Sequence, residues 1–169
     1  MKVTIFNAIS ADGYISDRNG YTKWASDNDY KFFLQLVKKS RVILMGRKTY
    51  ELNKSLFPFN CDLNIVITSD KELIQNSYKK ALFTNEAPDL IIKNLEGQNY
   101  SDLLVIGGGL TNSLFLNSGL VDEIILDVHP ILLGKGTNFA TELSSNIPLE
   151  LINTTKLDSQ HLVLQYRVR

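Results

Sequence analysis

Two short apolar stretches of the chain each lead through glycine into a segment with a helical pattern. Arg41–Met45 is followed by a glycine and a short helix over Arg47–Leu52. Leu103–Ile106 is followed by the three glycines Gly107–Gly109 and a helix over Leu110–Asn117. Strands that pass through a tight turn into a helix predict an α/β sheet, whose ligands bind beyond the carboxyl ends of the strands.

The rest of the chain extends this pattern into one sheet covered by helices. Hydrophobic periodicity and turn residues predict further strands, further helices and a pair of strands that ends the chain. The further strands cover Lys2–Ile9, Leu63–Thr68 and Glu123–His129. One further helix runs from Asp27 or Asn28 to about Lys39, and another covers Pro88–Leu95. The terminal pair of strands is Leu149–Lys156 and Gln160–Val168. Ser10–Trp24, with its glycine turn signals, is expected to be a loop. The predicted fold is a three-layer α/β domain with a mixed, mostly parallel central sheet, flanking helices and a C-terminal antiparallel hairpin.

Length and charge limit the classes of protein to consider. The 169 residues contain no repeat and no Pro-rich linker, so a single domain over 1–169 is expected. Eighteen basic and eighteen acidic residues give a formal net charge of zero, which argues against nucleic acid and membrane surfaces as partners. The first residues show no signal-peptide pattern, and we expect a cytoplasmic protein. One Cys and two His are too few for a structural zinc site, and no metal is expected.

Both glycine turns could hold phosphate groups. A helix N-terminus presents free backbone N–H groups and a partial positive charge, and glycine lets a ligand approach the backbone. The first turn combines Gly46 with donors on Arg47, Lys48 and Thr49; the second is Gly107, Gly108 and Gly109 followed by Leu110 and Thr111. The alternative for each is a turn without a ligand. Three consecutive glycines exceed what a tight turn needs, which favours a ligand at the second.

A third segment places two carboxylates, Asp27 and Asp29, at the start of the apolar helix. Either can simply cap the helix or complement its dipole. The alternative is that Asp29 points into a pocket shared with Trp24, where it could bind an amidine-like ring edge or supply a proton. A fourth segment carries His129 on a predicted strand. We expect a structural histidine there, because no Ser–His–Asp or Cys–His arrangement can be assembled.

Taken together, these segments resemble the dihydrofolate reductase fold, and in particular the bacterial family similar to the C-terminal reductase domain of the riboflavin-biosynthesis protein RibD. The resemblance runs from Ile5 to Val168. Its motifs are Ser10-Ala-Asp12-Gly13-Tyr-Ile15; Trp24 with Asp29; Met45-Gly46-Arg47-Lys48-Thr49-Tyr50-Glu51; Val66-Ile-Thr68-Ser69; Ile106-Gly107-Gly108-Gly109; and Val121-Asp122-Glu123 leading to Pro130-Ile-Leu-Leu133-Gly134-Lys-Gly136. Their joint order is specific for the superfamily, and the last motif favours the RibD-like branch.

The resemblance implies NADPH as the cofactor. Gly46, Arg47, Lys48 and Thr49 match the helix start that holds the cofactor phosphates, and Thr68 and Ser69 match the strand end near the adenosine 2′-phosphate. Gly107, Gly108, Gly109, Leu110 and Thr111 match the glycine turn under the pyrophosphate and nicotinamide, in which the family's Gly-Gly peptide is cis. Ala8, Asp12 and Ile15 match residues beside the nicotinamide.

On the substrate side, the resemblance implies a ring pocket lined by Trp24 and Asp29, with Asp12 and Phe33 beside them. Asp29 is the expected catalytic acid, because hydride arriving at a C=N carbon leaves charge on nitrogen that must be protonated. Asp27 lies two residues away, so which acid acts stays open. Residues 53–60 offer no evident clamp for a para-aminobenzoyl-glutamate tail, and the zinc-deaminase motif of bifunctional RibD is absent from this chain.

We therefore expect an NADPH-dependent reductase that passes hydride to a small heterocycle, of the 5-amino-6-(5-phosphoribosylamino)uracil reductase type. The alternatives are dihydrofolate reductase activity and a nucleotide-binding module without catalysis; a structural protein is the least favoured. Relatives of this kind suggest a homodimer, formed through apolar strand residues such as Ile124 and Leu126 or through the C-terminal hairpin.

Overall fold

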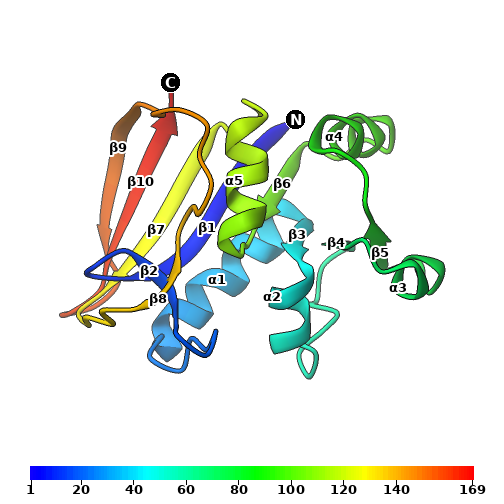
Figure 1. Cartoon of the computed structure of the whole chain (residues 1–169). Coiled ribbons are helices and arrows are strands. Elements are labelled where there is room, and N and C mark those ends of the chain that lie inside the picture. The colour runs from blue at the N-terminus through cyan, green and yellow to red at the C-terminus, as the bar shows by residue number, and fades with distance from the viewer.

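The computed structural model describes residues 1–169, which form an eight-stranded sheet with helices on both faces and a separate two-stranded sheet (Figure 1). The strands are β1 (Lys2–Ser10), β2 (Tyr14–Asp17), β3 (Val42–Gly46), β4 (Leu63–Ile67), β5 (Ala81–Thr84), β6 (Asp102–Val105), β7 (Glu123–His129), β8 (Gly136–Asn138), β9 (Leu149–Lys156) and β10 (Leu162–Val168). The helices are α1 (Asp27–Ser40), α2 (Arg47–Leu52), α3 (Lys71–Gln75), α4 (Pro88–Gly97) and α5 (Gly109–Asn117).

The large sheet has the order β5-β4-β3-β6-β1-β7-β10-β9. From β5 through β4, β3, β6 and β1 to β7, each strand is parallel to the next, whereas β10 is antiparallel to both β7 and β9. The mixed, mostly parallel sheet with a C-terminal antiparallel hairpin is thus confirmed. Because the parallel strands share one direction, their carboxyl ends lie along one edge of the sheet, where ligands of such sheets bind.

Apolar side chains fill both faces of the sheet. One core joins the sheet to α4 and α5 through residues such as Ile91, Leu95 and Phe115. The other joins it to α1 through Phe33 and Val37. The parallel strands read as continuous apolar runs because both of their faces are covered. In Figure 1, α5 lies in front of the sheet and α1 behind it.

Five elements depart from the sequence-based expectation. The segment Ser10–Trp24 is not wholly a loop: β2 lies inside it and pairs antiparallel with β8. Both strands are short, and β8 follows a glycine-rich turn, so neither shows a clear alternation of apolar and polar residues. Helix α3 and strand β5 were also missed, because α3 has only five residues and β5 only four. Helix α1 begins at Asp27 but is capped by Ser26, whose hydroxyl accepts from the N–H of Asp29, so neither expected cap is correct.

The expected contact surface for a second copy is wrong in part. Ile124 is only 2% exposed and belongs to the core under α5, so it cannot contact another chain. Leu126 packs partly buried against the same core. On the C-terminal hairpin, Leu149 and Leu151 of β9 are exposed. Among the helices, none combines the length and the apolar character needed to cross a membrane.

Candidate functional site

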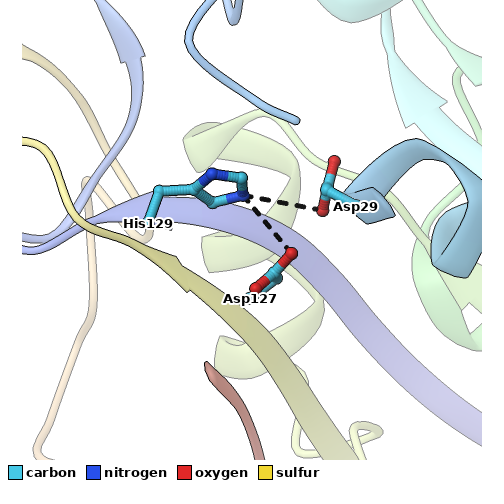
Figure 2. A group of neighbouring side chains, drawn as sticks. All are labelled: Asp29, Asp127 and His129. Atoms are coloured by element: carbon cyan, nitrogen blue, oxygen red, sulfur yellow. Dashed lines mark ion pairs between the residues drawn. The ribbon is translucent and has the colours of Figure 1, made fainter. Parts of the chain in front are cut away.

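Two carboxylates and a histidine meet on the sheet face that α1 covers. Nε2 of His129 lies 3.3 Å from Oδ2 of Asp127 and 3.9 Å from Oδ1 of Asp29. Figure 2 shows the imidazole nitrogen facing both carboxylates, one from the strand below it and one from the start of a helix. The three residues are buried, with exposed fractions of 0% for Asp127, 1% for His129 and 7% for Asp29.

The positions of the three residues follow from the topology. Asp127 and His129 are two residues apart on β7, so their side chains leave the same face of the strand. That face also carries Ile125, which packs in the core beneath α1. Helix α1 starts at the edge where β7 ends, and its first turn brings Asp29 over the strand. Asp29 is therefore the carboxylate that faces His129 and Asp127, whereas Asp27 is exposed.

The cluster is surrounded by aromatic rings. Trp24 meets the ring of His129 edge-on, with centroids 5.2 Å apart, and His161 lies on another side with centroids 4.5 Å apart. His161 is fixed in turn by Asp158, whose Oδ2 lies 2.7 Å from its Nδ1. Trp24 and Asp29, predicted to share a pocket, are thus brought together around the same imidazole.

Several buried polar atoms here have no hydrogen-bond partner. They are Nε1 of Trp24, Oδ1 of Asp29, both carboxylate oxygens of Asp127 and both ring nitrogens of His129. Leaving a buried donor or acceptor unpaired costs about 1–3 kcal/mol, so such groups are rare unless they have a functional partner. Their concentration at one edge of the sheet marks this cluster as the place where a polar ligand would complete the hydrogen bonding.

The charges of the cluster shift its acid–base equilibria. Burial lowers the pKa of the His129 imidazole, but Asp127 and Asp29 outweigh burial and raise it to about 9. Burial also raises the pKa of the Asp29 carboxyl group; Asp127 adds to this rise and His129 opposes it. His129 is therefore protonated at neutral pH, and Asp29 is easier to protonate than an ordinary aspartate.

The same three side chains are of the kinds that can ligate a divalent cation, and one ligand atom from each lies within 4.8 Å of the others. A metal-bound imidazole usually donates its second ring N–H to an acceptor, which fixes the ring. Here Nδ1 of His129 has no partner. The raised pKa of His129 also opposes metal binding, which requires the neutral ring. The arrangement fits acid–base chemistry better than metal binding.

The two glycine turns predicted from the sequence lie side by side. The N–H of Gly46 donates to the carbonyl oxygen of Gly107 at 2.8 Å, and a Cβ added to Gly46 would overlap Oγ1 of Thr111. A Cβ on Gly108 would lie 3.6 Å from Oγ1 of Thr49. The peptide bond between Gly107 and Gly108 is cis, as the resemblance implied. The carboxyl ends of β3 and β6 thus form one continuous backbone surface.

The helices that start at these glycines have free N-termini. The N-cap residues of α1 and α3 are Ser26 and Asp70, whose side chains accept first-turn N–H groups. The N-cap residues of α2 and α5 are Gly46 and Gly108, where no side chain does so. The first-turn N–H groups of α2 and α5 remain available to an anion. The residues present therefore fit the phosphates of a dinucleotide cofactor.

Arg47 and Lys48, the cationic side chains at this edge, differ in whether an acidic side chain pairs with them. Nε of Arg47 donates to Glu51 at 2.7 Å, and its Nη1 lies 3.6 Å from Asp70. The hydrogen bond with Glu51 raises the pKa of Arg47. Lys48 is exposed, and no ion pair holds it. At the end of β4, the buried hydroxyl of Thr68 accepts from the N–H of Asp70, while Ser69 is exposed.

The remaining predicted site residues have mixed positions. Asp12 accepts from the Ser10 hydroxyl at 2.6 Å and from the N–H groups of Leu133 and Gly134. Its two oxygens tie the turn after β1 to the loop after β7, which is a structural role that the sequence did not suggest. Phe33 stacks on Phe6 in the core.

Ala8 pairs with Asp127 across β1 and β7, so it lies beside the acid–base cluster. Ile15 is buried on β2. Leu110 is 58% exposed near the start of α5, beside the glycine turn.

A surface groove with a volume of about 810 Å³ lies at the opposite edge of the sheet. Its charged groups are already paired, as in Lys2 with Glu123, and Arg167 and Arg169 with Glu150. No unpartnered buried polar atom points into it. The polar atoms that need a partner are therefore at the carboxyl edge of the sheet.

The chain is similar to several known proteins. Residues 1–163 match the family model for the RibD C-terminal domain. Among curated proteins, the chain is 29% identical to the uncharacterized protein YwjB of Bacillus subtilis, over 98% of this chain and 97% of YwjB. It is 28% identical to the uncharacterized protein YyaP of the same organism, over 94% of this chain and 90% of YyaP.

Solved structures show the same fold. A Shewanella protein provisionally assigned to riboflavin biosynthesis superposes with a TM-score of 0.84 at 25% identity, covering 100% of this chain and 99% of that one. The deaminase/5-amino-6-(5-phosphoribosylamino)uracil reductase of Thermotoga maritima gives 0.80 at 16% identity, covering 99% of this chain and 56% of that one. Dihydrofolate reductase from Enterococcus faecalis, complexed with NADP(H), gives 0.76 at 18% identity, covering 99% and 96%. The fold is that of dihydrofolate reductase.

Proposed function

Because the chain belongs to the RibD C-terminal domain family, we propose that it is an NADPH-dependent reductase that transfers hydride to a small heterocyclic substrate. The observation that carries the proposal is the position of Asp29. This buried carboxyl group stands at the same sheet edge as the glycine turns that can hold a dinucleotide. Hydride donation and proton donation can therefore reach one substrate from one edge of the fold.

The cofactor assignment rests on the two glycine turns and on the family. The free first-turn N–H groups of α2 and α5 are suited to the phosphates, and Lys48 supplies an unpaired positive charge beside them. A bound nicotinamide cofactor would supply the hydride. The NADP(H) complex of the structurally similar dihydrofolate reductase supports the same cofactor for this chain.

The substrate assignment rests on the other half of the site. Asp29 offers a carboxyl group and Trp24 an unpartnered buried N–H, which together suit a ring that carries both N–H donors and a carbonyl acceptor. Aminopyrimidines have such an edge. The riboflavin-type reductase among the structural neighbours supports a 5-amino-6-(5-phosphoribosylamino)uracil-like substrate.

A substrate screen with a matched variant tests the proposal. NADPH oxidation is followed with aminopyrimidine ribotides and, separately, with dihydrofolate, for the wild-type protein and for Asp29→Asn. We expect turnover with an aminopyrimidine, and a loss on the order of 10²-fold or more in kcat for the variant, since a proton donor typically contributes that much. Cofactor affinity should be unchanged. Turnover of dihydrofolate alone would move the assignment to dihydrofolate reductase activity, and full activity of Asp29→Asn would remove the carboxyl group from the chemistry.

A further inference from the structure

The proposed reduction needs one proton for each hydride, and Asp29 can hold only one. Asp29 is 7% exposed, and Oδ1 of its carboxyl group is buried without a hydrogen-bond partner, so water reaches this oxygen poorly. After one proton has passed to the substrate, the carboxylate must be recharged before the next turnover. One other titratable side chain faces Oδ1 of Asp29.

That group is the imidazole of His129. Its Nε2 is 3.9 Å from Oδ1 of Asp29 and 3.3 Å from Oδ2 of Asp127 (Figure 2). Asp127 is wholly buried and accepts no hydrogen bond from any other group. A carboxylate buried without another partner can serve only the ring beside it, by holding its charge and orientation.

One of the groups that face His129 is partly exposed to solvent. The titratable groups that face the ring are Asp29 from α1, Asp127 from β7 and His161 from the turn between β9 and β10. The side chain of His161 is 13% exposed, and its ring contacts that of His129 with centroids 4.5 Å apart. Asp158 holds His161 from the solvent side.

We propose that His129, oriented by Asp127, resupplies the proton that Asp29 delivers to the substrate. His129 is a positioning residue in this scheme, since it acts through Asp29 and does not touch the substrate. The catalytic part of this inference rests on the proposed reductase function. The electrostatic effect of the Asp127 and Asp29 carboxylates on the His129 imidazole does not depend on that function.

Protons and electrons balance over one turnover. Hydride from the nicotinamide reaches a carbon of the substrate, and the O–H bond of Asp29 breaks as its proton binds the neighbouring substrate nitrogen. Oδ1 of Asp29 then takes the proton from Nε2 of His129, which leaves the imidazole neutral beside Asp127. One proton from solvent restores the imidazolium. Each turnover therefore consumes one hydride and one solvent proton, and the cluster returns to its starting charge.

Because the chain has only two histidines, nitrogen-resolved NMR of the imidazole rings can follow each one in the cofactor-free protein. A His161→Gln spectrum assigns the signals. In wild-type protein, we expect His129 to stay protonated well above neutral pH. In Asp127→Asn, its titration midpoint should fall by about one pH unit or more, since an opposite charge at this distance has been removed. Asp29→Asn should lower the midpoint in the same direction, and it is a second test if Asp127→Asn folds poorly.

Asp158→Asn is the matched control, because Asp158 pairs with His161 and not with His129. It should leave the titration midpoint of His129 in place. If neither Asp127→Asn nor Asp29→Asn moves the His129 midpoint, the inference is overturned. It is also overturned if one equivalent of Zn²⁺ at neutral pH shifts the His129 nitrogens selectively, which would make the cluster a metal site.

A kinetic readout separates proton supply from a merely structural role. With the substrate found in the screen, the high-pH limb of kcat should move to lower pH in Asp127→Asn by the same amount as the NMR midpoint, with KM little changed. A uniform loss of activity at every pH would contradict proton resupply. If NADPH does not bind at all, the reductase proposal fails, and the NMR result still decides the charge relationship on its own.

Discussion

Gly46 and Thr111 meet where the two glycine turns join, and no side chain fits between them. A Cβ on Gly46 would overlap Oγ1 of Thr111, which stands on α5 more than sixty residues later in the chain. Gly46 donates its N–H to Gly107 in the same place. The backbone surface that could hold a dinucleotide thus depends on a close approach of β3 and α5.

Gly46→Ala should destabilise the protein by about 1–3 kcal/mol, because overpacking in a close contact costs this much. Thr111→Ala removes the overlapping oxygen, so the double variant Gly46→Ala/Thr111→Ala should recover most of the loss. Urea unfolding of the four proteins gives the coupling energy. Additive effects of the two substitutions would mean that the two residues do not compete for the same space.

A second glycine tests the packing of α5 against β8. A Cβ on Gly109 would overlap the carbonyl oxygen of Asn138 and crowd Thr141, so Gly109→Ala should also cost about 1–3 kcal/mol. Gly97→Ala is the matched control, because a methyl group on this last residue of α4 would have no other atom within 4 Å. Its unfolding midpoint should match or exceed that of the wild type. Equal effects of the two substitutions would contradict the described packing.

Stability should depend on pH through the acid–base cluster. The pKa of His129 is raised from 6.5 to about 9, so its contribution is fully present below pH 6.5 and is lost as pH rises through about 9. The raised pKa of Asp29 has the same sign, because folding favours its protonated form. Thermal unfolding should therefore show that the advantage of wild type over Asp127→Asn shrinks between pH 6.5 and 9.

Asp62→Asn is the control for that experiment, because Asp62 forms an exposed pair with Arg41 far from the cluster. Its stability difference from wild type should be small, within about 1 kcal/mol, and nearly constant over the same pH range. A difference between wild type and Asp127→Asn that stays constant with pH would contradict the charge state assigned to His129.

Lys48 should contribute to cofactor binding more than Arg47 does, because Arg47 is already engaged by Glu51 and Asp70. Lys48→Ala should weaken NADPH binding by about tenfold or more, since a charge-assisted contact is worth about 1.5–3 kcal/mol. Lys93→Ala, at an exposed position of α4, controls for the loss of one positive charge. Calorimetric titration measures the NADPH affinity of both variants. Equal affinities of Lys48→Ala and Lys93→Ala would show that Lys48 is not part of the phosphate site.

The sequence predicted the fold well because its parallel strands are short, apolar and followed by glycine or a helix start. The glycine turns and Asp29 were found for the same reason: each sits where a periodic pattern begins or ends. The short elements β2, β8, α3 and β5 were missed, because their pairing partners lie far away in the chain or too few residues carry a pattern.

Asp127 and His129 were the functional candidates that the sequence did not reveal. Two polar residues spaced by two in an apolar strand share one face, which was a usable signal. The sequence could not show that α1 would place a carboxylate over that face. The motif of Asp12 suggested a ligand contact, and it did not reveal that this carboxylate accepts a hydrogen bond from the loop at Gly134.

The most direct test of the proposed reductase is a titration of the purified protein with NADPH and with NADH, followed by the fluorescence of Trp24. It is the only tryptophan of the chain, and it stands against His129 at the proposed site. We predict saturable quenching by NADPH, with weaker binding of NADH. Absence of binding by either cofactor at millimolar concentration would contradict the reductase assignment and leave the glycine turns as structural features of the fold.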